Sequence, residues 1–172
     1  MRRLLTTAAL ALALCAASQA ARAQDVQTYT TDRIEYALDL PNATWRAVPR
    51  ADSAHEHVDF VYGDRADGLL RIRKELVEDG VRLEDLARRD QDNKLRFQRG
   101  YIEGKQDNFP GRLKGLASSY EFTGGGKPMV GVIYYLQADP RTVYVLHFTG
   151  AKDKLLRARA QTDAIARSFR VK

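Results

Sequence analysis

Apolar and polar residues alternate in several short stretches of this chain, and the alternation predicts β-strands. Residues 70–76 are the clearest case, with apolar positions Leu70, Ile72 and Leu76 and charged positions Arg71, Arg73 and Glu75 between them. A period of two with charges on one side is typical of an antiparallel strand that faces water on one face. Residues 27–31, 33–40 and 58–62 are also predicted strands, from their composition and the turn residues that end them.

Two later stretches repeat in steps of three and four residues, which predicts amphipathic helices. The first covers residues 83–101 and ends near Gly100 or Gly104. Its repeating positions are Leu83, Leu86, Asp90, Lys94, Phe97 and Tyr101. The second helix closes the chain, and its apolar stripe consists of Leu155, Ala158, Thr162, Ile165, Ala166 and Phe169.

The segment between these helices predicts a turn and three strands. Residues 108–111 read Asn-Phe-Pro-Gly and predict the turn, and the strands follow at residues 113–123, 129–137 and 142–149. Short connections at residues 124–126 and 138–141 are typical of antiparallel neighbours. The sequence therefore predicts an α+β fold, a largely antiparallel sheet with a central and a C-terminal helix packed on it.

Three segments carry a resemblance to a known family. The first is Tyr-Ala-Leu-Asp-Leu-Pro at residues 36–41, followed by Trp45. The second is Phe-Pro-Gly at residues 109–111, leading to the strand that contains Tyr120, and the third is residues 143–148 followed by a helix that closes on residues 165–169. Together they resemble the PsbP-like family, named for an extrinsic subunit of the photosynthetic oxygen-evolving complex.

The resemblance covers residues 27–171 and implies an α/β/α sandwich that docks to a partner without chemistry. Many bacterial members of the family are exported proteins with no assigned role. No residue here matches a functional motif of the plant subunit, so the resemblance does not imply a photosynthetic role.

The N-terminus has the three parts of a cleavable secretory signal. Arg2 and Arg3 form the positive start, residues 4–17 are apolar, and Ala-Arg-Ala at residues 21–23 is an A-x-A cleavage site. The apolar run is shorter than the ~20 residues that a membrane span requires. We therefore expect a signal peptide at residues 1–23.

Two other interpretations of this N-terminus are weaker. Cys15 follows Leu14, whereas a lipobox has a small residue there, and no extended motif surrounds the paired arginines to indicate twin-arginine export. Ordinary secretion is the better interpretation, and it predicts a periplasmic or secreted mature protein. We expect residues 24–172 of this protein to form one globular PsbP-like domain.

Cleavage would change the chemistry of the chain. Loss of Arg2, Arg3 and Arg22 lowers the formal net charge from +6 to +3, and loss of Cys15 removes the only cysteine. The remaining basic residues are interspersed with acids, which argues against a nucleic-acid partner. The longest later apolar stretch, residues 130–136, is too short to span a membrane.

A metal site is one hypothesis for the segment that contains His55, His57 and Asp59. Alternate residues of an extended chain point to one side, and zinc or copper accepts these ligands. The alternative is an exposed polar strand or loop, because no fourth ligand stands out. The sequence leaves open whether His55 and His57 bind a metal.

Other candidate motifs have ordinary structural explanations. Gly-Gly-Gly-Lys at residues 124–127 lacks the spacing of a phosphate loop and precedes Pro128 and a strand, which favours a hairpin tip. His147 lies in an apolar strand, which favours a partly buried, hydrogen-bonded imidazole over a catalytic base. No serine lies in a nucleophile elbow. We therefore expect neither an enzyme nor a bound cofactor.

Tyr134 and Tyr135 are consecutive, so they must face opposite sides of the sheet. Core packing is the simpler explanation of each tyrosine. The alternative is that one of them lines an open surface or pocket, which would suit a small-ligand carrier.

An exported, non-enzymatic docking or accessory module is the leading functional hypothesis, and Arg71 and Arg73 are its candidate partner-binding residues. Both guanidinium groups should project from one side of a strand while Lys74 points to the other, and paired arginines bind carboxylates or phosphates well. The alternative is that they are solvated or paired with neighbouring acids. The partner would be an envelope protein or an anionic surface. A carrier, or a hydrolase without a visible motif, remains an alternative, and the sequence predicts no oligomeric state.

Overall fold

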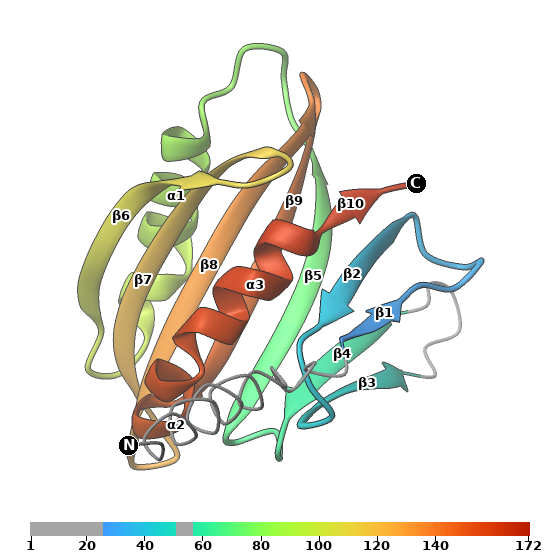
Figure 1. Ribbon diagram of the computed structural model, residues 1–172. Coiled ribbons are helices and arrows are strands. Elements are labelled where there is room, and N and C mark those ends of the chain that lie inside the picture. Colours follow the sequence, from blue (N-terminus) through green and yellow to red (C-terminus); the bar gives the residue numbers. More distant parts are fainter. Residues whose placement is uncertain (1–25, 51–56) are drawn as a thin grey trace, which may run out of the picture.

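The computed structural model describes residues 26–50 and 57–172. Within them, seven antiparallel strands form one sheet in the order β3-β4-β5-β9-β8-β7-β6 (Figure 1). These strands are β3 (Trp45–Arg50), β4 (His57–Tyr62), β5 (Gly68–Leu76), β6 (Ile102–Pro110), β7 (Lys114–Gly124), β8 (Lys127–Asp139) and β9 (Thr142–Ala151). A smaller sheet contains β1 (Gln27–Tyr29), β2 (Tyr36–Leu40) and β10 (Arg170–Val171) in the order β1-β2-β10.

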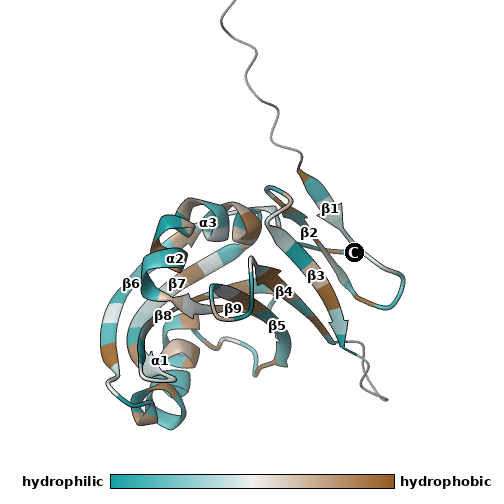
Figure 2. Cartoon of the chain, turned by 90° about the horizontal axis from the view of Figure 1, so that it is seen from below, coloured by the Kyte–Doolittle hydropathy of each residue, from teal (hydrophilic) through white to brown (hydrophobic). Residues whose placement is uncertain are grey.

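Helices lie on both faces of the large sheet. On one face, α3 (Arg159–Ser168) follows α2 (Lys152–Arg157) and packs beside β2. On the other face lie α1 (Leu83–Asn93) and the short 3-10 helix η1 (Leu95–Phe97). Figure 2 shows the sheet between these helices. The fold is α+β with a largely antiparallel sheet, as the sequence predicted.

The core on the α3 side confirms the predicted stripe of the C-terminal helix. Every residue of that stripe is buried. Phe169 directly follows α3 and its ring lies 5.3 Å from that of Tyr36 and 5.0 Å from that of Tyr144, measured between centroids. Aromatic pairs at this distance add to the stabilisation that comes from burial alone. The end of α3 is therefore held to both sheets.

The central helix is shorter than predicted. Leu83, Leu86 and Asp90 are buried against the sheet, but the backbone leaves helical geometry at Lys94, where φ is −137°. The chain then forms η1, and Phe97 is 77% exposed. The prediction of one helix over residues 83–101 was wrong because the three- and four-residue spacing continued past the point where the backbone turns away.

Three strands escaped the sequence analysis: the two-residue β10 of the small sheet, and β3 and β6, which lie at the edges of the large sheet. All residues of β6 except Phe109 are exposed, so the strand has no apolar alternation to detect. Its last residues were wrongly predicted as a turn, which instead begins at Gly111. Proline is tolerated at a sheet edge, where its missing N–H group is not needed, and β6 contains Pro110 and β3 contains Pro49.

The tip between β7 and β8 confirms the hairpin interpretation of the glycine run. Gly125 and Gly126 have φ angles of 57° and 76°, and Gly124 pairs with Lys127 across the turn. A two-residue hairpin turn with both φ angles positive favours glycine strongly. Among the described residues, no helix combines the length and apolar character needed to cross a membrane.

Candidate functional site

On the α1 side, one half of the large sheet is left uncovered by the helices of residues 26–50 and 57–172. Helix α1 packs on β7 and β8, and Figure 2 shows no helix below β4 and β5. A hollow of about 420 Å³ lies in this uncovered half. It is lined by Arg50, His57, Val58, Asp59, Arg71, Ile72, Arg73, Val145 and His147.

The hollow forms where the β3–β4 hairpin separates from the rest of the sheet. The pairing of β4 with β5 ends at Asp59 and Arg71. Strand β5 nevertheless continues beside β9 until Leu76 pairs with Thr142. Residues 57 and 58 therefore pair only with β3, and a gap opens beside Ile72.

Asp59 is the centre of a group of arginines at this gap. Its carboxylate is only 3% exposed and accepts a hydrogen bond from Nη1 of Arg65 at 2.6 Å. Nε of Arg71 lies 3.6 Å from the carboxylate and Nε of Arg50 lies 4.0 Å away. Among the described residues, three guanidinium groups thus surround one carboxylate, which leaves a surplus of positive charge within this set.

Arg71 has the position that the alternation predicted. Its guanidinium group lies on the α1 side and is 60% exposed. The contact with Asp59 is longer than a hydrogen bond. Lys74 forms its ion pair with Glu35, which precedes β2 on the opposite side of the sheet.

Arg73 points to the same side as Arg71 but has a different environment. It donates hydrogen bonds to Glu75 and to the buried Asp90 of α1. Burial alone would raise the pKa of Asp90, but the hydrogen bond and charge of Arg73, together with the charges of Lys94 and Arg89, outweigh it and hold this pKa below its usual range. The hydroxyl of Tyr135 also donates to Asp90, at 3.2 Å. Arg73 therefore helps to attach α1 to the sheet.

His147 is the inner neighbour of Arg71, since the two residues are paired between β5 and β9. Its Nε2 atom is hydrogen-bonded to the hydroxyl of Tyr120 at 2.8 Å. Burial and the nearby charge of Arg73 lower the pKa of His147 to about 4. The imidazole is therefore neutral at neutral pH, in agreement with the interpretation of a partly buried, hydrogen-bonded histidine.

The metal hypothesis gains no support from the described residues. His55 lies outside them, and within them no three His, Cys, Asp or Glu side chains are grouped to hold a metal ion. Asp59 is engaged by arginines, which compete with a cation for its oxygen atoms.

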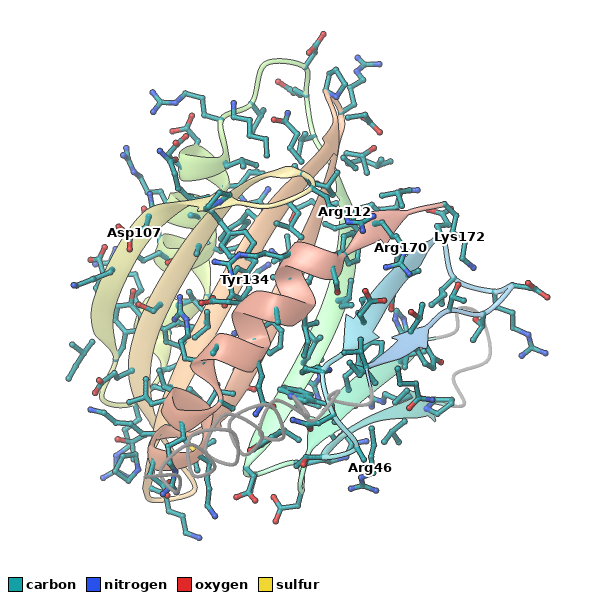
Figure 3. All side chains as sticks on the ribbon, in the orientation of Figure 1. Arg46, Asp107, Arg112, Tyr134, Arg170 and Lys172 are labelled. Carbon is teal, nitrogen blue, oxygen red and sulfur yellow. The ribbon has the colours of Figure 1, made fainter. Side chains whose placement is uncertain are left out.

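Tyr134 and Tyr135 face opposite sides of the sheet as predicted, but neither lines an open surface. Both are completely buried. The hydroxyl of Tyr134 is hydrogen-bonded to Thr162 and Asp163 of α3 (Figure 3), and that of Tyr135 to Asp90 of α1. Neither tyrosine therefore supplies the open tyrosine-lined face of the carrier hypothesis, because each ring and its hydroxyl are used to attach a helix.

The sequence analysis missed two members of the arginine group, Arg50 and Arg65. Arg50 ends the unpredicted edge strand β3, and Arg65 lies in the turn between β4 and β5. Their approach to Asp59 depends on the strand register, which no local pattern revealed.

No protein-family model and no curated protein sequence matches the chain. Solved structures do match it. The solution structure of cyanobacterial PsbP from Synechocystis has a TM-score of 0.60 at 16% identity and covers 92% of this chain and 99% of that one. The Saccharomyces cerevisiae Ran-binding protein Mog1p has a TM-score of 0.59 at 9% identity, covering 86% and 96%.

LpqN of Mycobacterium tuberculosis, a protein involved in cell envelope biogenesis, has a TM-score of 0.54 at 13% identity, covering 87% of this chain and 92% of that one. Identities this low establish the fold alone. The large antiparallel sheet between α1 and α3, together with these likenesses, shows that the chain has a PsbP-like fold.

Proposed function

We propose that this chain is an exported, non-enzymatic docking module. Its contact surface is the uncovered half of the sheet around Arg71, and its partner is an envelope protein that presents an acidic group. The N-terminal signal pattern supports export. The fold agrees with a docking role, since one neighbour is a Ran-binding protein and another takes part in envelope biogenesis.

The exposed guanidinium of Arg71 is the observation that carries this proposal. Asp59 already has a short hydrogen bond from Arg65, so Arg71 keeps its donors for another acceptor. Arginine binds a carboxylate through two parallel hydrogen bonds, which fixes orientation as well as charge. A concave site also suits a projecting side chain better than it suits the flat surface of a membrane.

The residues of the hollow also support a role without chemistry. None of its described lining residues is a serine, threonine, cysteine, lysine or tyrosine, and its one carboxylate, Asp59, is already hydrogen-bonded to Arg65. Of its two histidines, His147 is neutral and already hydrogen-bonded to Tyr120.

The proposal is tested by affinity capture from native envelope extract with the mature protein as bait. The Arg71→Ala variant should retain much less of the partner than the wild type, with a thermal midpoint within about 2 °C of the wild-type value. Raising the salt concentration should weaken wild-type capture, because exposed charges are screened over ~10 Å at 0.1 M.

The matched control is Arg112→Ala. Arg112 is exposed in the turn between β6 and β7, on the α3 side of the sheet (Figure 3). Its loss removes the same charge and should leave capture unchanged. Equal capture by the wild type and a folded Arg71→Ala variant would contradict the proposal. Arg73 is not suitable for this test because its removal would leave the buried Asp90 without its main partner.

A further inference from the structure

Phe97 is a large apolar side chain that the fold holds in solvent. It ends η1 and is 77% exposed, whereas Leu95, two residues earlier, is buried in the core on the α1 side. A 3-10 helix has about three residues per turn, so Leu95 and Phe97 point in different directions. Burial of Leu95 therefore fixes η1 with Phe97 projecting from the surface.

The surroundings of Phe97 are cationic. Residues 94–101 contain Lys94, Arg96 and Arg99 and no acidic residue. Lys94 and Arg96 pair with acids of α1, but both side chains remain more than half exposed. Among the described residues, the guanidinium group of Arg99 forms no ion pair or hydrogen bond. Phe97 is thus flanked on both sides by cations that face water.

The neighbouring hairpin turn adds a further cation. The carbonyl oxygen of Arg99 accepts a hydrogen bond from the backbone N–H group of Thr123 at 2.7 Å, which places Arg99 beside the turn between β7 and β8. Lys127 is exposed directly after that turn and, within the described part of the chain, forms no ion pair. Phe97, Arg99 and Lys127 together form one corner of the molecule, named here the Phe97 tip.

Leu76 provides a comparison within the same molecule. It is also 77% exposed, but residues 75–79 contain three acids and no base. Leu76 pairs with Thr142 beside the turn between β8 and β9, at the opposite end of the sheet from the turn between β7 and β8 (Figure 1). An equally exposed apolar side chain is therefore combined with cations at one end of the sheet and with anions at the other.

We propose that the Phe97 tip binds the surface of an anionic lipid bilayer, with the Phe97 ring at the boundary between headgroups and acyl chains and with Arg99 and Lys127 on lipid phosphates. An anionic bilayer attracts cations near its surface, and an apolar ring gains free energy by leaving water. The tip is separate from the hollow, whose lining residues belong to β3, β4, β5 and β9. The inference therefore goes beyond the proposed function and does not depend on it.

A bilayer fits this tip better than a protein partner does. Specific protein interfaces bury about 1,200–2,000 Å² between complementary shapes, whereas Phe97 projects from a single turn of helix. A fluid bilayer surface accepts a projecting ring without a preformed pocket. We expect weak, reversible binding, because one ring and a few cations give much less affinity than a membrane-spanning helix.

Co-sedimentation of the purified mature protein with lipid vesicles tests the inference. Vesicles of equal parts phosphatidylglycerol and phosphatidylcholine should bind the protein, and vesicles of phosphatidylcholine alone should bind it about tenfold more weakly or less. Added salt should weaken binding to the anionic vesicles, because it screens the charges. Equal binding to both kinds of vesicle would overturn the inference.

Two matched pairs of variants locate the contact. Phe97→Ala should weaken binding to the anionic vesicles by about tenfold or more, whereas Leu76→Ala should leave it unchanged. Arg99→Ala should weaken it by about fivefold, the effect of one cation near the surface, whereas Arg112→Ala at the other end of the sheet should have no effect. All four side chains are exposed, so the variants should fold like the wild type. Equal binding by the wild type and Phe97→Ala would contradict the inference.

Tryptophan fluorescence measures insertion directly. Emission from Phe97→Trp should shift to shorter wavelength when anionic vesicles are added, and emission from Leu76→Trp should not. The native Trp45 is 1% exposed and adds a constant background. Unshifted emission from Phe97→Trp would overturn the inference. Self-association or protein capture that Phe97→Ala abolishes, without any vesicle binding, would assign the tip to a protein contact instead.

The inference and the proposed function can fail separately. Arg71→Ala should bind anionic vesicles like the wild type, and Phe97→Ala should still capture the partner from a detergent extract. Vesicle binding that is lost in Arg71→Ala but kept in Phe97→Ala would place the lipid contact at the hollow and overturn the inference.

Discussion

Asp59 and Asp90 are two buried carboxylates on the same side of the sheet, and the arginines around them have different roles. Arg73 and the hydroxyl of Tyr135 hold Asp90, which lies in α1. Asp59 binds Arg65 closely and leaves Arg71 exposed. Arg71 and Arg73 are equivalent in the sequence pattern, but their acidic neighbours give them different roles. Arg73 helps to hold α1 on the sheet, whereas the side chain of Arg71 stays exposed.

His147 provides a prediction at the residue scale. In the unfolded chain a histidine takes up its proton near pH 6.5, whereas in the folded chain His147 does so near pH 4. Between these values the unfolded state binds more protons, so stability should decrease as the pH falls from about 6.5 to about 4, by up to about 3 kcal/mol. Denaturant titrations across this range measure the effect.

His147→Gln is the control for this pH dependence, because glutamine can hydrogen-bond to Tyr120 without titrating. The variant should lose less stability than the wild type between pH 6.5 and pH 4. Carboxylates titrate in both proteins, so the difference isolates the histidine. Parallel stability curves for the two proteins would mean that His147 is not buried in its neutral form.

The strands and helices differ in how well the pattern of apolar and polar residues predicted them. Strand β5 and the stripe of α3 were predictable because their apolar residues face a core on one side and water on the other. Strands β3 and β6 were not, because an edge strand with few buried residues has no such contrast. The hollow depends on β3, through Arg50, and on the register that places Arg71 beside Asp59. The shared side of Arg71 and Arg73, and that of His57 and Asp59, followed from the sequence, but their assembly around one hollow did not.

The attachment of α1 to the sheet gives a prediction at the element scale. Arg73→Ala should lower the free energy of unfolding by about 2–4 kcal/mol, because it removes a partner of a buried charge. Arg71→Ala should change it by no more than about 0.5 kcal/mol, as for an ordinary surface residue. Chemical denaturation of both variants measures the difference. Equal losses would contradict the separate roles of the two arginines.

The whole molecule has two differently covered sheet faces. In the part of the chain that the structure describes, two helices and the small sheet cover the α3 face, whereas α1 covers the other face over β7 and β8 (Figures 1 and 2). A half-covered face with surplus charge is available for a partner without any rearrangement of the core. The compartment in which that partner is found depends on export, which stays a prediction from the N-terminus.

Export is tested by mass spectrometry of the protein recovered from its native host. We expect a mature N-terminus close to residue 24, because Ala-Arg-Ala at residues 21–23 has the pattern that signal peptidase cleaves. An intact Met1 would contradict this expectation and the proposed envelope partner with it, whereas a lipid attached to Cys15 would contradict cleavage after residue 23.

Site-specific photo-crosslinking in intact cells tests the central claim most directly. A photoreactive residue at position 57, on the exposed rim of the hollow, should form an adduct with an envelope protein. The same residue at position 112, on the other side of the sheet, should form none, and adding Arg71→Ala should abolish the adduct at position 57. An adduct that appears at position 112 alone, or that persists at position 57 without Arg71, would contradict docking through this hollow.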